Sequence, residues 1–151
     1  MNELNTQLVA LDERVGTDIS SARSFEDVMT TAGFDFDVEK VEVHDPEGTP
    51  VNGHFIIRRT DTNFPFACMR KRYNVVPMEE MLEPFHKMVT EHGLQYENAG
   101  LIQNGRKRWI SARFPDDWNI KNRPDDKLNN RIMALLSNDG TSLNAYFSIA
   151  N

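Results

Sequence analysis

The stretch LQYENAGLIQNGRKRWISARF, residues 94–114, decides the fold because it holds two strand-forming runs on either side of a tight-turn dipeptide. Asn104-Gly105 is typical of two-residue hairpin turns, since both central positions of such a turn need a positive φ. The flanking runs, Leu94 to Ile102 and Arg106 to Phe114, are therefore predicted to form an antiparallel β-hairpin.

Strand-forming runs continue on both sides of this hairpin. Upstream, Phe34 to Val43 begins by alternating apolar and acidic side chains, which is the pattern of a half-buried strand. Downstream, Asn138-Asp139-Gly140 supplies the turn residues of a second hairpin. The other predicted strands cover residues 55–60, 66–74, 128–137 and 141–150.

Two segments carry helical signals. The first begins at Ser24, a residue type favoured as an N-cap, and ends at Gly33. The second begins at Pro77 and ends at Gly93, with apolar side chains at helical spacing along one face. Pro84 lies inside this second pattern and predicts a kink or a break in the helix.

These elements together predict the fold class. Consecutive hairpins favour an antiparallel sheet, and the helices need such a sheet to bury their apolar faces. The expected fold is α+β, an antiparallel sheet of hairpins with one long and one short helix packed on one face. We expect a single domain over residues 24–151, preceded by a polar N-terminal arm or short helix over residues 1–23.

The composition excludes several classes of protein. Apolar residues make up 39% and charged residues 26%, which is typical of a globular domain and not of a disordered chain. No apolar run approaches the roughly 20 residues that span a bilayer, and the N-terminus lacks the pattern of a signal peptide. The single cysteine, Cys68, excludes an internal disulfide. We therefore expect a cytoplasmic protein with no membrane association, in which Cys68 is a buried and inert thiol.

The net charge of −6 is unevenly distributed along the chain. Residues 1–50 hold three basic and twelve acidic side chains, whereas residues 51–151 hold fourteen basic and eleven acidic ones. The acidic first third could repel nucleic acid, mimic it or merely solvate a surface. The rest of the chain allows a local anion-binding patch.

Two basic runs are the strongest functional signal. Arg70-Lys71-Arg72-Tyr73 and Arg106-Lys107-Arg108-Trp109 each place three cations beside an aromatic ring, and Arg58 with Arg59 could extend the same surface. Binding of single-stranded nucleic acid needs cations along the phosphates and rings on which the bases stack. The alternatives are solvated strands whose charges prevent edge-to-edge aggregation, or salt bridges to the acidic first third.

The strand geometry assigns roles within these runs. Neighbouring side chains on a strand face opposite sides, so each run can present only half of its residues to one ligand. In the nucleic-acid hypothesis the cations neutralise phosphate while Tyr73 and Trp109 stack on bases. The candidate nucleic-acid-binding residues are Arg58, Arg59, Arg70, Arg72, Tyr73, Arg106, Lys107, Arg108 and Trp109.

Catalytic and metal-binding patterns are weak by comparison. His86 and His92 are six residues apart, which is the wrong separation for a metal-binding pair on a helix. The carboxylate pairs Asp116-Asp117 and Asp125-Asp126 fall in a predicted loop, where such residues usually form turns or caps. No glycine-rich phosphate loop is present. We therefore expect no catalytic residue, no metal and no cofactor.

Several short motifs, taken in their order along the chain, resemble a known family. They are Arg58-Arg59-Thr60-Asp61, Tyr73-Asn74-Val75-Val76-Pro77, Tyr96-Glu97-Asn98-Ala99-Gly100, Gly105-Arg106-Lys107-Arg108-Trp109 and Ser137-Asn138-Asp139-Gly140-Thr141. With them the chain resembles the phage/plasmid-like domain of unknown function that occurs widely in bacteriophage and plasmid genomes. The order of its elements is also distantly similar to phage single-strand annealing proteins. The resemblance implies a phage or plasmid protein that acts in the host cytoplasm.

Two functional hypotheses follow. The first is a non-catalytic, homo-oligomeric protein that binds single-stranded DNA during phage replication or recombination. The second is a protein-interaction module that binds a host or phage protein, for example as an inhibitor of host defence, without binding nucleic acid. In that case Asp35, Asp37, Glu39 and Glu42, on or near one predicted strand, would supply the contact surface.

Overall fold

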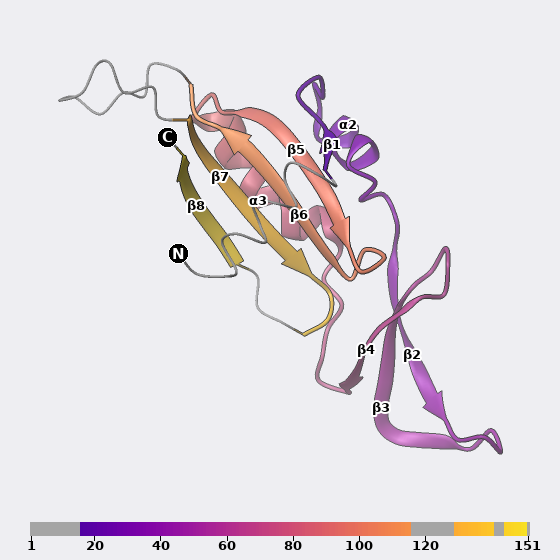
Figure 1. The fold of residues 1–151 in the computed structure, drawn as a ribbon. Coiled ribbons are helices and arrows are strands. Elements are labelled where there is room, and N and C mark those ends of the chain that lie inside the picture. The colour runs from indigo at the N-terminus through magenta and orange to yellow at the C-terminus, as the bar shows by residue number, and fades with distance from the viewer. Residues whose placement is uncertain (1–15, 116–128, 141–143, 151) are drawn as a thin grey trace.

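The fold consists of two antiparallel sheets and two helices in the computed structural model, which describes residues 16–115, 129–140 and 144–150. Figure 1 shows a larger sheet at one end of the molecule and a smaller sheet that extends away from it. The larger sheet and its helices are called the body, and the smaller sheet the arm. Residues 1–15, which are most of the polar segment predicted to precede the domain, lie outside the described residues, and so do both carboxylate pairs of the predicted loop.

The body is built on a five-stranded sheet with the order β1-β5-β6-β7-β8, in which every neighbouring pair is antiparallel. Strands β5–β6 and β7–β8 form the two predicted hairpins, and β1 adds to the edge of β5 from far away in the sequence. The strands are β1 (Thr17–Asp18), β5 (Gln95–Ile102), β6 (Lys107–Arg113), β7 (Asn129–Ser137) and β8 (Asn144–Ala150).

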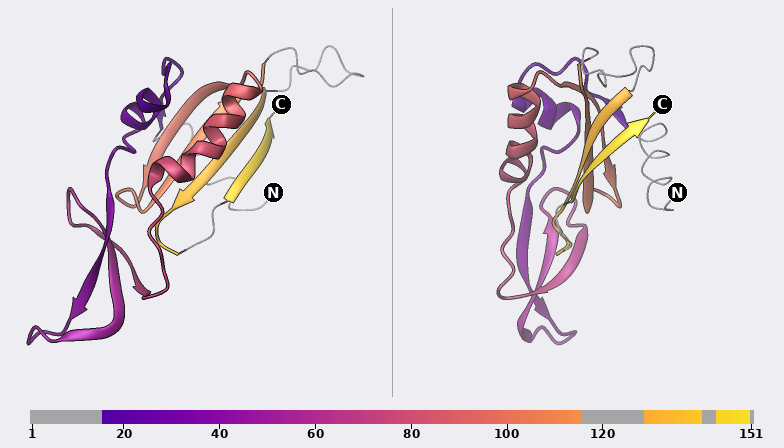
Figure 2. Two further views of the ribbon diagram at one scale, coloured as in Figure 1. Left: turned by 180° about the vertical axis from the view of Figure 1, so that it is seen from behind. Right: turned by 90° about the vertical axis from the view of Figure 1, so that its left-hand side faces the viewer.

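The helices pack against one hydrophobic core of the body. Helix α3 (Met78–Glu91) lies along one face of the sheet, as Figure 2 shows, and buries its apolar stripe there. Helix α2 (Phe25–Thr31) begins with a capping box made by Ser24 and Asp27 and adds buried side chains to the same core. Of the predicted kink or break at Pro84, the break is absent, since α3 continues through this exposed residue. Neither helix is long and apolar enough to cross a membrane.

The arm is a separate three-stranded sheet with the order β2-β3-β4. Its strands are β2 (Val38–His44), β3 (Pro50–Arg59) and β4 (Pro65–Arg70). Three side chains, Phe36, Ile57 and Phe66, form its buried cluster. The predicted α+β class is confirmed, but the strands divide into two sheets instead of forming one. Among the described strands β4 pairs only with β3, and the chain then leaves through residues 71–77 to start α3 in the body.

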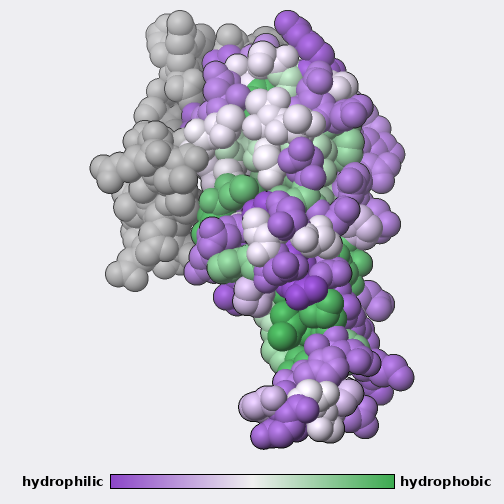
Figure 3. Space-filling view, turned by 90° about the vertical axis from the view of Figure 1, so that its right-hand side faces the viewer, coloured by the Kyte–Doolittle hydropathy of each residue, from purple (hydrophilic) through white to green (hydrophobic). Residues whose placement is uncertain are grey.

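The surface of the arm is only partly covered. Figure 3 shows hydrophobic side chains accessible on the lower part of the molecule, between hydrophilic ones. Cys68 is exposed on β4, so the prediction of a buried thiol is wrong. The physical reason is that Cys68 pairs with Ile56 on the face of the arm opposite Ile57, whereas the buried cluster of the arm surrounds Ile57.

Candidate functional site at the junction of the two sheets

The arm meets the body around one aromatic ring. Phe36 comes immediately before the arm, and two guanidinium groups lie over its ring: that of Arg59 at 3.6 Å and that of Arg108 at 4.1 Å from the ring centroid. Gly105, in the β5–β6 turn, also approaches the ring so closely that a Cβ atom there would lie 2.5 Å from the Phe36 Cζ atom. Phe36 thus connects residues of both sheets.

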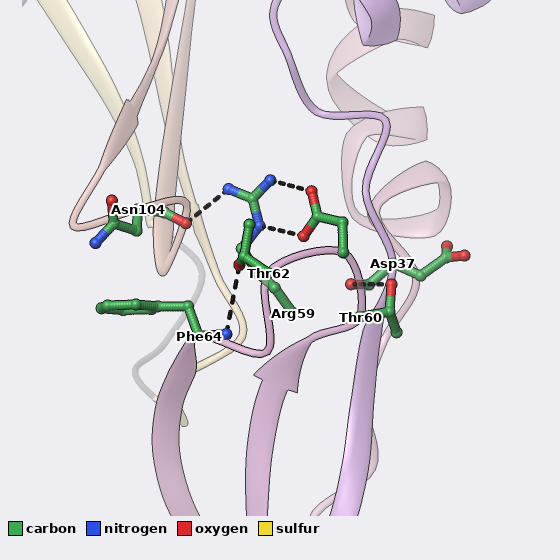
Figure 4. A network of polar contacts seen from close by, with 7 residues as sticks. Asp37, Arg59, Thr60, Thr62, Phe64 and Asn104 are labelled. Atoms are coloured by element: carbon green, nitrogen blue, oxygen red, sulfur yellow. Dashed lines mark hydrogen bonds and ion pairs between the residues drawn. The ribbon is translucent and has the colours of Figure 1, made fainter.

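Arg59 fixes this junction from the arm side. Its guanidinium donates to both carboxylate oxygens of Asp61, with 2.8 Å from Nε to Oδ1, and its Nη1 donates to the carbonyl of Asn104 in the body at 2.9 Å. Figure 4 shows the turn around Arg59, in which the Thr60 hydroxyl donates to the Asp37 carbonyl and the Phe64 N–H donates to the Thr62 hydroxyl. The hydrogen bonds from Arg59 keep the pKa of Asp61 below its usual value. Arg59 is therefore a structural connection between the two sheets.

Arg108 belongs to the body side and is buried. Its side chain is 1% exposed, and its Nη1 donates to Asn138 Oδ1 at 2.8 Å and contacts the Met78 sulfur at 3.0 Å. Its Nε and Nη2 atoms have no hydrogen-bond partner. Burial, and then repulsion from Arg59, lower the pKa of Arg108 to about 10, so the group is charged at neutral pH. A buried cation with two unpaired donors is rare in proteins, because it costs free energy.

The turn after β7 brings the two predicted basic runs together. Asn138 donates through Nδ2 to the carbonyl of Val76 at 3.0 Å, and Arg106 forms an ion pair with Asp139 at 2.9 Å. Burial raises the pKa of Tyr73, and the nearby carboxylate of Asp139 raises it further, so Tyr73 also lies beside this turn. Residues from both runs thus contact one turn.

A pocket of about 220 Å³ opens at this junction. Its walls come from the start of the arm, from the segment that leads into α3, and from the body. The lining residues are Phe36, Asp37, Val38, Val75, Val76, Pro77, Met78, Arg108 and Asn138. Within the described part of the chain no three His, Cys, Asp or Glu side chains are placed to hold a metal ion.

The exposed cations of the first basic run are Arg70, Lys71 and Arg72. They lie in a turn at the end of β4, which is called the basic turn. Lys40 holds this turn from below, because its Nζ donates to the carbonyls of Lys71 and Tyr73 at 2.7 Å each. The three cationic side chains of the turn are exposed. None of them forms an ion pair with a described residue.

The nine predicted binding residues therefore separate into groups. Arg70 and Arg72 are exposed, and Tyr73 and Lys107 are half-buried. The other exposed or half-exposed arginines are paired with carboxylates: Arg58 with Glu39, Arg59 with Asp61, and Arg106 with Asp139.

The expectation that Trp109 and Arg108 lie on an accessible surface is wrong. Trp109 is 1% exposed and packs with Met133 in the body, and Arg108 is equally buried. The reason is that both faces of β6 are covered, so alternation along this strand does not separate a buried side from an exposed side. Trp109 cannot stack on a base without leaving the interior.

Two residues of the junction were not predicted to act there. Phe36 was expected only as an apolar position of a strand, and Asn138 only as a turn former. No sequence signal indicated the role of Asn138, because that role depends on the burial of Arg108, which needs a side-chain acceptor. No local signal in the sequence places Phe36 against Arg108, because 72 residues separate them.

Comparison with known proteins identifies the family to which the chain belongs. The model of the DUF932 family, a domain of unknown function, matches residues 65–148. The matched segment covers more than half of the chain, so the chain belongs to this family. It includes the basic turn, Arg108 and Asn138, whereas Phe36 and Arg59 lie outside it. No curated protein and no solved structure matches the chain.

Proposed function

We propose that this protein is a non-catalytic nucleic-acid-binding protein of phage or plasmid origin, which acts in the host cytoplasm and contacts single-stranded DNA through the basic turn. The observation that carries the proposal is the exposure of Arg70, Lys71 and Arg72, three consecutive cations without carboxylate partners among the described residues. Unpaired cations at a fixed spacing are what a phosphate backbone requires.

The geometry limits the form of this binding. Of the two predicted stacking rings only Tyr73 is partly accessible, and it is half-buried beside Asp139. Arg58, Arg59 and Arg106 already neutralise carboxylates and add little positive potential. The interaction therefore rests on about three phosphate contacts, which for a single strand gives a slope of about −2 in log K against log salt.

The test is fluorescence anisotropy with a labelled single-stranded oligonucleotide at low and at moderate salt. The variant Arg70→Gln/Arg72→Gln is expected to lose at least ten-fold in affinity at low salt. The matched control is Arg23→Gln/Lys87→Gln, which removes the same charge from exposed positions elsewhere and should lose little. Equal losses in both variants, or no binding by the wild-type protein at low salt, would reject the proposal.

The arm also favours a second function, binding of a host or phage protein or of another copy of this chain. Val41, Ile56 and Cys68 form one row across the three strands; Cys68 is exposed and the other two are half-buried. An accessible apolar row on a projecting sheet is typical of an interaction surface. If the partner is another copy of this chain, Ile56→Lys should abolish self-association in sedimentation analysis. If it is another protein, the same substitution should abolish a capture of that partner that resists nuclease treatment. Oligonucleotide binding should stay intact in both cases.

A further inference from the structure

We propose that the junction pocket binds a phosphate group between Arg108 and the N-terminus of helix α3. The starting point is the unbalanced charge of Arg108, which is 1% exposed and has no carboxylate within ion-pair distance among the described residues. Buried arginines are almost always paired with an acid, since leaving the charge unpaired is costly. A bound anion would provide the missing counter-charge.

The hydrogen bonding of Arg108 is also incomplete, which again leaves room for an anion. Stacking on Phe36 engages the flat face of the guanidinium, whereas the N–H donors lie in its plane. Only Nη1 has partners, and Nε and Nη2 have none. The group lines the pocket, and its Nε and Nη2 are adjacent nitrogens that could bind two oxygens of an oxyanion once the ligand displaces the atoms that cover them.

Helix α3 supplies a second set of donors. Its N-cap, Pro77, makes no side-chain hydrogen bond to the helix, and both Pro77 and the first helical residue, Met78, line the pocket. The first N–H groups of a helix have no partners within it and carry the positive end of the helix dipole. Helix N-termini with such free N–H groups are common phosphate sites. The buried arginine is an independent observation at the same place.

The size and the other charges of the pocket agree with one small anion. A volume of about 220 Å³ holds a phosphate group together with a few waters, since a water occupies about 30 Å³. The guanidinium of Arg59 is close enough to lower the pKa of Arg108, although its ion pair with Asp61 offsets most of its charge. Asp37 also lines the pocket and opposes an anion, while Glu79 favours the charged form of Arg108 without forming an ion pair with it.

This inference does not depend on the proposed DNA binding, because the pocket and the basic turn are different sites. The phosphate group could be free inorganic phosphate or the terminal phosphate of a nucleic acid. These sources are separated by comparing inorganic phosphate with a 5′-phosphorylated oligonucleotide and its unphosphorylated twin.

The experiment measures the thermal midpoint in inorganic phosphate and in chloride at equal ionic strength. The wild-type midpoint is expected to rise by about 4 °C when phosphate is at ten times its dissociation constant. Arg108→Met, which removes the charge and keeps the volume, should fold at least as stably and should lose the rise. Arg70→Met, the control on the basic turn, should keep it.

Two further outcomes decide the proposal. Asp37→Asn should enlarge the phosphate-induced rise, because it removes the only carboxylate among the residues that line the pocket. An equal rise in the wild type and in Arg108→Met would overturn the site. So would the absence of a rise in the wild type at a phosphate concentration 50 times the dissociation constant of a ~1 mM site. A stronger effect of the 5′-phosphorylated oligonucleotide than of its twin, lost in Arg108→Met, would assign the phosphate to a nucleic-acid end.

Discussion

The body and the arm are both antiparallel sheets, yet they bury very different cores. The main core of the body contains seventeen buried apolar residues from both helices and the sheet, whereas the cluster of the arm contains three. A three-stranded sheet with so small a cluster is marginal by itself. The difference teaches that the arm depends on its attachment to the body, and that attachment consists mainly of Phe36, Arg59 and the side chains they contact.

The largest effect is expected where the body core is removed. Leu82→Ala, at a fully buried position of α3, should lower the free energy of unfolding by about 2–5 kcal/mol through lost burial and a residual cavity. Urea denaturation followed by circular dichroism measures the loss. Val51→Ala, at an arm residue that is 41% exposed, is the control and should change little. A loss below 1 kcal/mol for Leu82→Ala would contradict the assignment of the main core to the body.

Gly100→Ala tests how tightly the other face of the body is packed. Gly100 lies opposite Trp109 in the β5–β6 register, and a Cβ atom there would lie 2.5 Å from the indole Nε1. The expected loss is about 1–3 kcal/mol from overpacking. In a Trp109→Leu background the same substitution should cost much less. Equal costs in the two backgrounds would show that the ring does not occupy the space above Gly100.

Arg59→Ala should loosen the arm and leave the body intact. It removes the hydrogen bonds to Asp61 and to the Asn104 carbonyl, which are worth about 1–3 kcal/mol for a charged group. Hydrogen exchange read by mass spectrometry should rise in β2 to β4 and stay constant in β5 to β7. Arg58→Ala removes an ion pair that is about one-third exposed and should cost about 0–1 kcal/mol. Faster exchange throughout the body after Arg59→Ala would contradict this picture.

The smallest effect is expected on the surface of the arm. Arg70→Gln/Arg72→Gln should change the free energy of unfolding by no more than about 0.5 kcal/mol, because neither side chain has an ion-pair partner in the described structure. Chemical denaturation of the same preparation that is used for oligonucleotide binding measures this. A larger loss of stability would mean that these cations serve the fold and not a ligand.

Much of the fold could be predicted from local patterns. Asn104-Gly105 does join β5 to β6, and the apolar stripe of α3 is buried as its spacing indicated. What could not be predicted is which strands share a sheet. The pairing of Thr17 with Ala99 spans 82 residues, and nothing in either segment specifies the other.

The candidate site was less predictable, because its chemistry depends on burial. In the sequence, Arg106-Lys107-Arg108-Trp109 looks the same whether the strand is exposed or covered on both faces. A clue to Trp109 lay in the hairpin register, which places Gly100 directly opposite and so leaves space for a large ring. That Arg108 has no ion-pair partner among the described residues appears only when the arm, α3 and the turn at Asn138 are assembled.

The chain enters the arm through residues 36–38 and leaves it through residues 75–77, and both passages form walls of the same pocket. A molecule held there would contact both connections between the arm and the body, so it would favour the orientation of the arm in which the pocket has this shape. By thermodynamic reciprocity, a partner that binds one orientation of the arm would in turn alter the affinity of the pocket for its ligand. Occupancy of the pocket and orientation of the arm would therefore be thermodynamically linked.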